Sequence, residues 1–260
     1  MKYYLTLLKR NPYEVIRKVC GLILEKSIPK SSSSKKVIIY SLGKAGTSSL
    51  YEVLRYLRNV DVRHVHYLSE MKEEINQWRV NEKKRANEVK KWLEKGDVLI
   101  ISLIRDPFSR SISSVIQNYE LYHMQSDFSD AIVKNAKTIS LNWWDEEFLK
   151  SLKWDVFQHP FNKDIGYSEY QLKNNNKLLI IKSSQISLSG LSKLSSELNV
   201  KLKEKVVNKS KTKKVAIQNK HILDRYKFNK KDFDFISRSK FMNHFYNAEE
   251  IAQLEKRWVE

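Results

Sequence analysis

The sequence has few of the residues that cross-link a fold or mark a membrane-spanning segment. Among its 260 residues there is one cysteine, Cys20, which excludes a disulfide framework and a cysteine-based zinc site and fits a reducing compartment. No apolar run approaches the roughly 18–20 residues that a membrane-spanning helix needs. The first residues lack a small-residue cleavage site after an apolar core, so we do not expect a signal peptide.

Acidic residues are fewer than basic residues. The 48 Lys and Arg residues against 30 Asp and Glu give a formal charge of +18, which favours polyanionic partners such as nucleic acid, anionic lipid, or phosphorylated and sulfated molecules. A Lys-rich background composition explains the same charge equally well, so charge alone assigns no function. The apolar content of 41% and six Trp residues indicate a globular protein.

The patterns along the chain divide it into three parts. Residues 1–30 carry apolar side chains at helical spacing and predict an amphipathic helical extension. Residues 31–36 are Ser-rich and predict a linker, and residues 37–260 predict one domain. An extension of this kind could contact a membrane peripherally. The expected location is therefore the cytoplasm, including the inner face of the membrane.

Apolar runs and helical patterns alternate through that domain. Strands are predicted at residues 37–42, 61–68, 97–104 and 177–182, and helices at 47–60, 69–96, from 107 onward and at 245–258. This alternation predicts an α/β fold: a P-loop-like, three-layer structure with a mainly parallel central sheet, flanking helices and a helical C-terminal part. Ligands of such sheets bind outside the carboxyl ends of the strands.

The first motif at that edge is SLGKAGTSSL, residues 41–50. Its lysine lies inside the loop, unlike the order GxxxxGK[ST] of a phosphate-binding loop. Glycines allow successive N–H groups to point inward, and the helix that follows adds its dipole, so the loop predicts an anion site. An ordinary strand-to-helix turn also uses Gly and a hydroxyl cap. The predicted ligand groups are Gly43, Lys44, Ala45, Gly46, Thr47, Ser48 and Ser49.

The second motif, LIRDPFSRSISS, follows the strand at 97–104. Asp106 suits a helix N-cap and Pro107 the first helical position. A guanidinium fork at Arg105 and a hydroxyl at Ser113 suit a phosphate monoester, and Arg110 could reach the same edge. The alternative is that Arg105 pairs with a carboxylate.

The third motif is RHVHYL. On a strand, His64 and His66 point to one face. No Asp, Glu or Cys stands nearby at ligand spacing, so we predict no metal site. A neutral imidazole can accept a proton from a hydroxyl, although a hydrogen-bonded strand histidine without a catalytic role is also common.

The first two motifs together, strand–KxGTxSL–helix and strand–RDPxxRxxSS–helix, resemble those of the PAPS-dependent sulfotransferases. The resemblance implies that Lys44, Gly46, Thr47 and Ser48 bind the 5' end of 3'-phosphoadenylyl sulfate, and that Arg105 and Ser113 bind its 3'-phosphate. The histidine pair is similar to the H-x-H strand of the carbohydrate 2-O-sulfotransferases, in which the second His is the base. Mapped onto this sequence, the base is His66, with His64 beside the substrate.

Residues 142–167 are rich in aromatic, acidic and Asn residues and resemble a block in sulfotransferase-like bacterial capsular polysaccharide synthesis proteins. Such residues suit the stacking and hydrogen bonding of sugar rings, and Trp144 and His159 are the substrate candidates. Trp154, Phe157 and Phe161 are expected to pack in the core. A basic run at 201–214 stands where cytosolic sulfotransferases close a basic segment over the nucleotide, which implies that role for Lys209 to Lys214.

The expected activity is transfer of a sulfuryl group from 3'-phosphoadenylyl sulfate to a hydroxyl of a glycan. His66 acts as base, Lys44 and the loop amides stabilise the leaving 5'-phosphate, and adenosine 3',5'-bisphosphate is released without a metal. One alternative is a kinase or ATPase that uses ATP and magnesium, with Asp106 as a Walker B aspartate. Another is a non-enzymatic polyanion or nucleic-acid binding protein, although no specific nucleic-acid motif is present. The sequence carries no signal for the oligomeric state.

Overall fold

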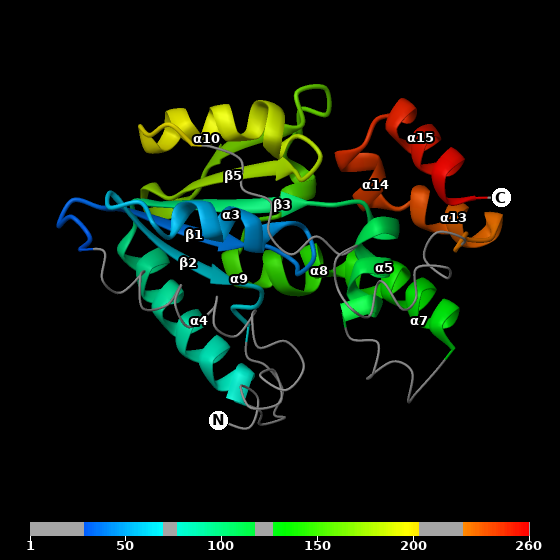
Figure 1. Cartoon of the computed structure of the whole chain (residues 1–260), viewed down its shortest axis with the longest axis horizontal. Helices are drawn as coiled ribbons and strands as arrows, with labels where there is room; N and C mark the ends of the chain where they lie inside the picture. The colour runs from blue at the N-terminus through cyan, green and yellow to red at the C-terminus, as the bar shows by residue number, and fades with distance from the viewer. Residues whose placement is uncertain (1–28, 70–76, 118–126, 203–225, 260) are drawn as a thin grey trace.

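The computed structural model describes residues 29–69, 77–117, 127–202 and 226–259. They form an α/β fold around a five-stranded sheet, with the strand order β2-β1-β3-β5-β4 (Figure 1). Four strands are parallel and β4 runs antiparallel to β5. The strands are β1 (Lys35–Tyr40), β2 (Val60–Val65), β3 (Val98–Ile104), β4 (Tyr167–Gln171) and β5 (Lys177–Lys182). Residues 1–28 of the predicted helical extension and the lysines at 209–214 lie outside the described residues.

The sheet is buried on both faces at its centre, as expected of continuous apolar runs. All seven residues of β3 are buried, because a parallel strand flanked by helices meets no solvent on either face. The structure adds β4, which the sequence did not predict. Its residues YSEYQ carry polar groups and none of them is fully buried, since this strand lies at the edge of the sheet.

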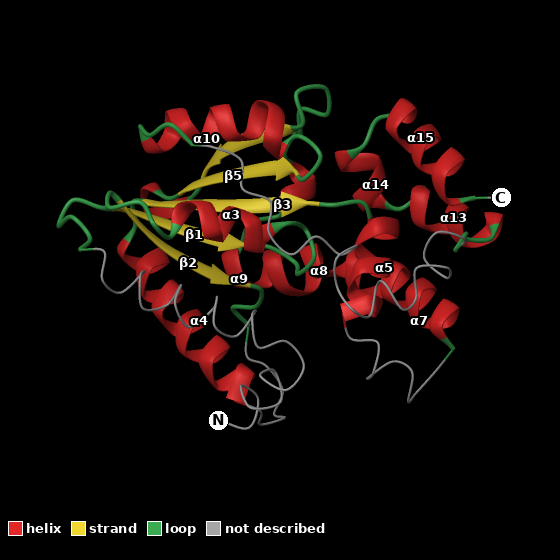
Figure 2. Cartoon of the chain, in the orientation of Figure 1, coloured by secondary structure: helices red, strands yellow, loops and turns green. Residues whose placement is uncertain are grey.

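Helices cover both faces of the sheet (Figure 2). On one face, Val37 and Ile39 of β1 pack in a cluster with the buried leucines of α3 (Thr47–Leu54) and α10 (Leu191–Leu198). On the other face, Ile38 and Tyr40 share a cluster with α4 (Gln77–Lys95), α5 (Pro107–Gln117) and a helical run at 128–152. That run comprises α7 (Phe128–Asn135), a π-turn (Ala136–Ser140), α8 (Leu141–Trp143), a second π-turn (Trp144–Leu149) and α9 (Lys150–Leu152).

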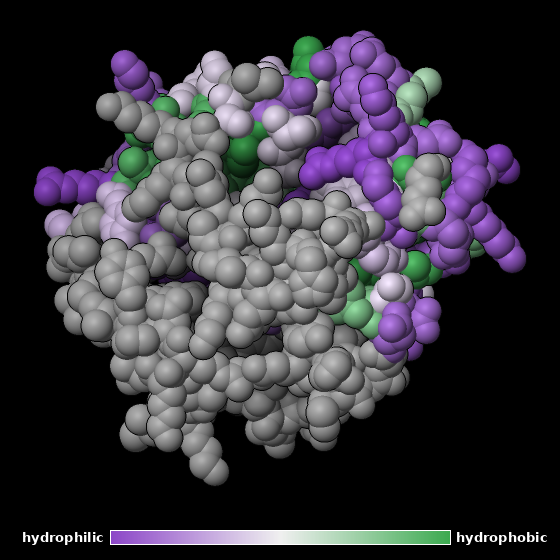
Figure 3. All heavy atoms as spheres, turned by 45° about the vertical axis from the view of Figure 1, so that its right-hand side comes forward, coloured by the Kyte–Doolittle hydropathy of each residue, from purple (hydrophilic) through white to green (hydrophobic). Residues whose placement is uncertain are grey.

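The C-terminal helices lie beyond the carboxyl ends of the strands, where the arrows point in Figure 1. They are α13 (Lys230–Ser237), α14 (Lys240–Phe245) and α15 (Ala248–Trp258). Short 3₁₀ or π segments occur at Val156–Gln158, Lys173–Asn175 and Ile186–Gly190. Hydrophilic side chains gather over this end of the molecule in Figure 3. The exposed basic residues of these helices and their turns are Lys230, Lys231, Arg238, Lys240, Lys256 and Arg257.

A buried ion pair ties α15 to the sheet. Lys182, the last residue of β5, is 1% exposed. Its Nζ donates to both carboxylate oxygens of Glu250 at 2.7 Å and to the Lys163 carbonyl at 2.9 Å. Glu250 also closes a capping box with Asn247 at the start of α15. This contact fixes the helix that follows Tyr246 against the carboxyl edge of the sheet.

We expect Glu250→Gln to lower the free energy of unfolding by about 3 kcal/mol, since it leaves a buried ammonium without its counter-charge. Glutamine retains the cap, because it is accepted at this position of a capping box. Urea unfolding measures the change. Glu255→Gln on the same helix is the matched control: its partner Lys230 is exposed, so the loss should stay within about 1 kcal/mol. Equal losses in the two variants would contradict the role of the buried pair.

The predicted linker and the first predicted helix both end earlier than expected. The predicted linker at 31–36 ends early, because Lys35 and Lys36 already pair with β2. Its remaining residues form a turn that is fastened to the body by Ser31 N–H, which donates to the Arg58 carbonyl (3.1 Å). The predicted helix at 47–60 ends at Leu54. Within the residues that the structure describes, no helix has the length and apolar character needed to cross a bilayer.

Candidate functional site

The loop after β1 turns through left-handed residues, but of its two glycines only Gly46 is one of them; the other left-handed residue is Lys44. Lys44 and Gly46 both have positive φ, at 76° and 95°. For lysine this left-handed geometry costs roughly 1–2 kcal/mol, so other contacts must hold it. Arg105 donates from NH1 to the Lys44 carbonyl (2.9 Å), and Arg110 donates from Nε to the Gly43 carbonyl (3.1 Å). Two guanidinium groups therefore hold the loop in a strained shape.

The amides of residues 45–48 take no part in the backbone hydrogen bonds of the described residues; Gly46 and Ser48 are exposed, whereas Ala45 and Thr47 are buried. Gly46 is the N-cap of α3 and supplies no side-chain cap. Within the described residues, no acceptor receives the N–H groups of residues 45–48. Consecutive unpaired N–H groups at a helix start form an anion site. Ser48 is exposed there, whereas the Ser49 amide is used in the first turn of the helix, where it donates to the Gly46 carbonyl at 3.0 Å.

The side chain of Lys44 reaches from the loop to α5. Its Nζ donates to Oε1 of Gln117, the last residue of that helix, at 2.6 Å. The ammonium group thus stands on the side of the loop that faces α5.

Arg105 lies beside the loop at the end of β3. Apart from the bond to the Lys44 carbonyl, its guanidinium N–H groups have no acceptor among the described residues, and it forms no ion pair with a carboxylate there. Burial lowers the pKa of Arg105, opposed by Asp106 and Tyr246 and supported by nearby Arg257. The alternative prediction, that Arg105 pairs with a carboxylate, is therefore wrong within the described residues. The guanidinium group has N–H groups left with which to bind a ligand.

The helix start predicted at Asp106 and Pro107 is confirmed. α5 begins at Pro107, and Asp106 Oδ1 accepts the N–H of Ser109 at 2.7 Å. The carboxylate that could resemble a Walker B aspartate is thus used to cap a helix. Ser113 is buried on the same helix, 5% exposed.

Arg110 has a different position from the one expected of a phosphate ligand. It is 5% exposed, and its NH1 donates to Asn135 Oδ1 (2.5 Å) and Ser140 Oγ (3.0 Å), while Nε holds the Gly43 carbonyl. All these acceptors belong to the protein. Arg110 is therefore a buried support of the loop, although it also lines a small cavity with Ala45 and Arg105 beside it.

His66 lies on the side of the loop that faces β2, whereas Arg105 lies on the side of β3. The register of β1 with β2 pairs Tyr40 with Val65 and so brings His66 beside Ser41. The ring Nδ1 lies 2.7 Å from the Ser41 carbonyl, which fixes Nδ1 as the protonated nitrogen. The outer edge of the ring, with Cε1 and Nε2, would lie 3.8 Å from a Cβ on Gly43, so the imidazole packs directly beside the loop. Burial lowers the pKa of His66, with Arg110 and Arg85 acting in the same direction and the Ser41 bond and Glu82 opposing it. The neutral imidazole is therefore the stable form near pH 7.

The predicted common face of the two histidines is confirmed, since their rings lie 4.7 Å apart. His64 packs against Tyr51 with ring centroids 5.7 Å apart, and its Nε2 is buried without a partner in the described residues. Burial, His66 and Arg85 hold its pKa well below the ordinary value. Only His66 has a nitrogen beside the loop. In the described residues, no three His, Cys, Asp or Glu side chains gather in a way that could hold a metal ion.

The structure places the two aromatic substrate candidates differently. Trp144 is 3% exposed and packs against Trp143, Phe148 and Phe245. It lines a small cavity beside the loop together with Ala45 and Arg105, but that cavity, of about 10 Å³, is too small for a sugar ring. This burial corrects the prediction that Trp144 contacts a sugar ring. Of the residues expected in the core, Phe161 is buried and Trp154 and Phe157 are half-buried.

His159 stacks on Trp154 with ring centroids 4.4 Å apart and lies 6.0 Å from the ring of Tyr170. Tyr170 pairs with Leu178 near the start of β5, so this histidine stands by the opposite edge of the sheet from β2. The structure therefore does not bring His159 to the loop, and a contact of His159 with substrate stays a prediction for a position away from it.

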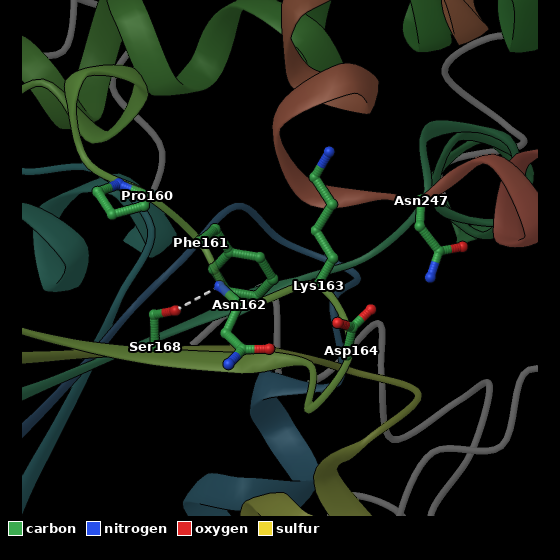
Figure 4. Close-up of a pocket in the computed structure, with 7 residues that line it drawn as sticks. All are labelled: Pro160, Phe161, Asn162, Lys163, Asp164, Ser168 and Asn247. Atoms are coloured by element: carbon green, nitrogen blue, oxygen red, sulfur yellow. Dashed lines mark hydrogen bonds between the residues drawn. The ribbon is translucent and has the colours of Figure 1, made fainter.

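An open pocket lies near that other edge (Figure 4). Ser168, on β4, lines one side, and Asn247, at the start of α15, lines another. With the strand order β2-β1-β3-β5-β4, about four strand spacings of 4.8 Å, roughly 19 Å, separate β4 from β2. The pocket is therefore too far from His66 to hold a hydroxyl at that base. Its remaining lining residues are Pro160, Phe161, Asn162, Lys163 and Asp164.

Comparison with known proteins identified no relative of this chain. No protein-family model matches the chain, and neither a search of curated proteins nor a search of solved structures found a match. The functional argument therefore depends on an anion loop, an open guanidinium and a neutral imidazole at one edge of an α/β sheet.

Proposed function

We propose that this protein is a sulfotransferase that moves a sulfuryl group from 3'-phosphoadenylyl sulfate to a hydroxyl of a glycan. The observation that carries the proposal is the packing of the His66 imidazole beside Gly43, in a loop whose following amides have no acceptor in the described residues. A base next to an anion site suits transfer of a group between a hydroxyl and a phosphate.

The residues present fit the donor. The amides of residues 45–48 and the ammonium of Lys44 suit the 5'-phosphosulfate end, and the open fork of Arg105 suits a phosphate monoester one strand away. A 3'-phosphate in that fork would distinguish this donor from ATP. Arg110 supports the loop from within the protein and contributes no ligand group.

In the proposed reaction, the acceptor hydroxyl lies between His66 and the sulfuryl group. Its oxygen forms a bond to sulfur while the bond from sulfur to the 5'-phosphate oxygen breaks, and that electron pair stays on the phosphate. The hydroxyl proton passes to His66 Nε2, which is able to accept it because Nδ1–H is held by the Ser41 carbonyl. Lys44 and the loop amides stabilise the charge on the departing phosphate. The products are a sulfate ester and adenosine 3',5'-bisphosphate.

We further propose a polysaccharide or other glycan as acceptor, and a location in the cytoplasm or at the inner face of the membrane. The single cysteine and the resemblance to capsular polysaccharide synthesis proteins support this part. The acceptor would approach from the side of β2, where His66 lies, because Arg105 and the C-terminal helices occupy the other side of the loop.

A thermal-shift titration tests the donor. Adenosine 3',5'-bisphosphate, added without metal at about 100 times its dissociation constant, should stabilise the protein by about 2.7 kcal/mol, a rise in Tm of roughly 5 °C. ADP lacks the 3'-phosphate and should stabilise it much less, with or without magnesium. An equal or larger shift with magnesium and ADP would support the kinase alternative instead. A strongly salt-dependent affinity for mixed-sequence DNA, with no nucleotide effect, would support the polyanion-binding alternative.

A further inference from the structure

A carboxylate is buried directly behind the candidate site. Glu147 is 3% exposed, and no Lys, Arg or His forms an ion pair with it within the described residues. An isolated buried carboxylate is costly unless hydrogen bonds replace the water that it loses. Five donors do so: Tyr40 OH (2.6 Å), Leu68 N–H (2.5 Å), Ser69 N–H (3.1 Å), Ser69 OH, and Ser151 OH (3.1 Å).

The positions of four of these donors show what the carboxylate holds together. Tyr40 immediately precedes Ser41, whose carbonyl accepts the Nδ1–H of His66. The donors of Leu68 and Ser69 lie two and three residues after His66. Glu147 therefore joins the end of β1 to the segment that follows the histidine. Only Ser151, one turn along its own helix, lies outside this connection.

The main chain of His66 itself is held on both sides by buried groups. Its N–H donates to Glu82 Oε1 at 2.9 Å, and its carbonyl accepts the indole N–H of Trp143 at 3.1 Å. Trp143 and Glu147 belong to the same helical run. The aromatic and acidic stretch that the sequence associated with sugar binding thus packs behind the histidine, on the side away from solvent.

We propose that Glu147 is a positioning residue for His66, which fixes the ring with Nδ1–H on the Ser41 carbonyl and Nε2 toward the loop. This inference deepens the proposed function, because it assigns the group that keeps the base in its working tautomer. The physical reason is geometric. The Ser41 carbonyl and the His66 ring belong to two chain segments, and Glu147 bonds to both of them. Without the carboxylate, each segment loses its shared acceptor and the imidazole is free to turn.

The test compares three variants by NMR of ¹⁵N-labelled imidazole, which reports the His66 tautomer directly. In the unaltered protein and in Ser151→Ala, we expect the Nδ1–H tautomer. In Glu147→Gln the amide N–H₂ would face other donors, and Tyr40→Phe removes one donor. In both variants we expect the Nε2–H form of His66 to become populated. With an acceptor sugar, these two variants should also lose about 10- to 100-fold in kcat, with unchanged affinity for adenosine 3',5'-bisphosphate.

A folded Glu147→Gln protein that retains the Nδ1–H tautomer would overturn the proposal. If that variant does not fold, an unchanged tautomer in Tyr40→Phe would do so. An effect of Ser151→Ala equal to that of Tyr40→Phe would mean that Glu147 acts only on stability. The NMR readout needs neither donor nor acceptor. A shift of tautomer without any bisphosphate binding would therefore refute the sulfotransferase proposal and leave the positioning role intact.

Discussion

Replacement of His66 by asparagine is expected to lower kcat by about 10²- to 10⁴-fold, the usual contribution of a general base. Asparagine keeps an N–H near the position of Nδ1, so the bond to the Ser41 carbonyl is retained while the proton acceptor at Nε2 is lost. Affinity for adenosine 3',5'-bisphosphate should stay unchanged, because the imidazole is not among the groups proposed to bind it. Steady-state kinetics with an acceptor sugar and a bisphosphate titration measure the two quantities.

The pH dependence of the same reaction gives a second measure of His66. Burial lowers the pKa of this histidine, so the neutral, competent form persists below pH 6.5. The value of kcat/KM should therefore remain constant as the pH falls past 6.5 and decline only below the lowered pKa. In His66→Asn this acid-side decline should vanish, since no titrating base remains.

The neighbouring histidine provides the control. His64→Asn removes a buried ring that packs on Tyr51 and His66 but has no nitrogen directed to the loop. A change in kcat of less than about tenfold is expected, together with some loss of stability from the cavity that is left. A larger loss of kcat in His64→Asn than in His66→Asn would exchange the roles assigned to the two residues.

Local signals in the sequence predicted the parts of the site that depend on neighbouring residues. The cap at Asp106 and Pro107, the turn at Gly46 and the common face of the histidine pair each follow from rules that act over a few residues. The parallel strands followed from continuous apolar runs. A sheet of this kind brings the ends of β1 and β3 together, which is why two motifs 60 residues apart were correctly expected at one edge.

The predictions that were wrong concern side chains whose contacts are distant in the sequence. Arg110 looks like a phosphate ligand until Asn135 and Ser140 fold against it. Trp144 looks like a sugar platform until Phe245, about a hundred residues later, covers it. Glu147 gave no signal at all, because an acidic residue between aromatics is usually exposed. Tertiary packing decides whether such side chains face ligand or core, and no local pattern records it.

Replacement of Arg105 by alanine is expected to weaken binding of adenosine 3',5'-bisphosphate by about 10- to 150-fold, the equivalent of 1.5–3 kcal/mol for hydrogen bonds to a charged group. The guanidinium has open N–H groups and no carboxylate partner in the described residues, so an arriving phosphate would complete its pairing. Isothermal titration calorimetry measures the dissociation constant. Arg105→Lys retains the charge without the planar fork and should recover only part of the affinity.

Arg105 also supports the loop through the Lys44 carbonyl, so a loss of binding could arise from a distorted loop rather than a lost ligand. Titration with 5'-AMP separates the two causes, because this nucleotide has the 5'-phosphate and lacks the 3'-phosphate. If Arg105 binds the 3'-phosphate, the alanine variant should lose the preference for the bisphosphate over 5'-AMP. If it only holds the loop, both nucleotides should weaken by the same factor and the preference should persist. That second result would contradict the assignment of the 3'-phosphate to Arg105, and with it the means by which the site would distinguish its donor from ATP.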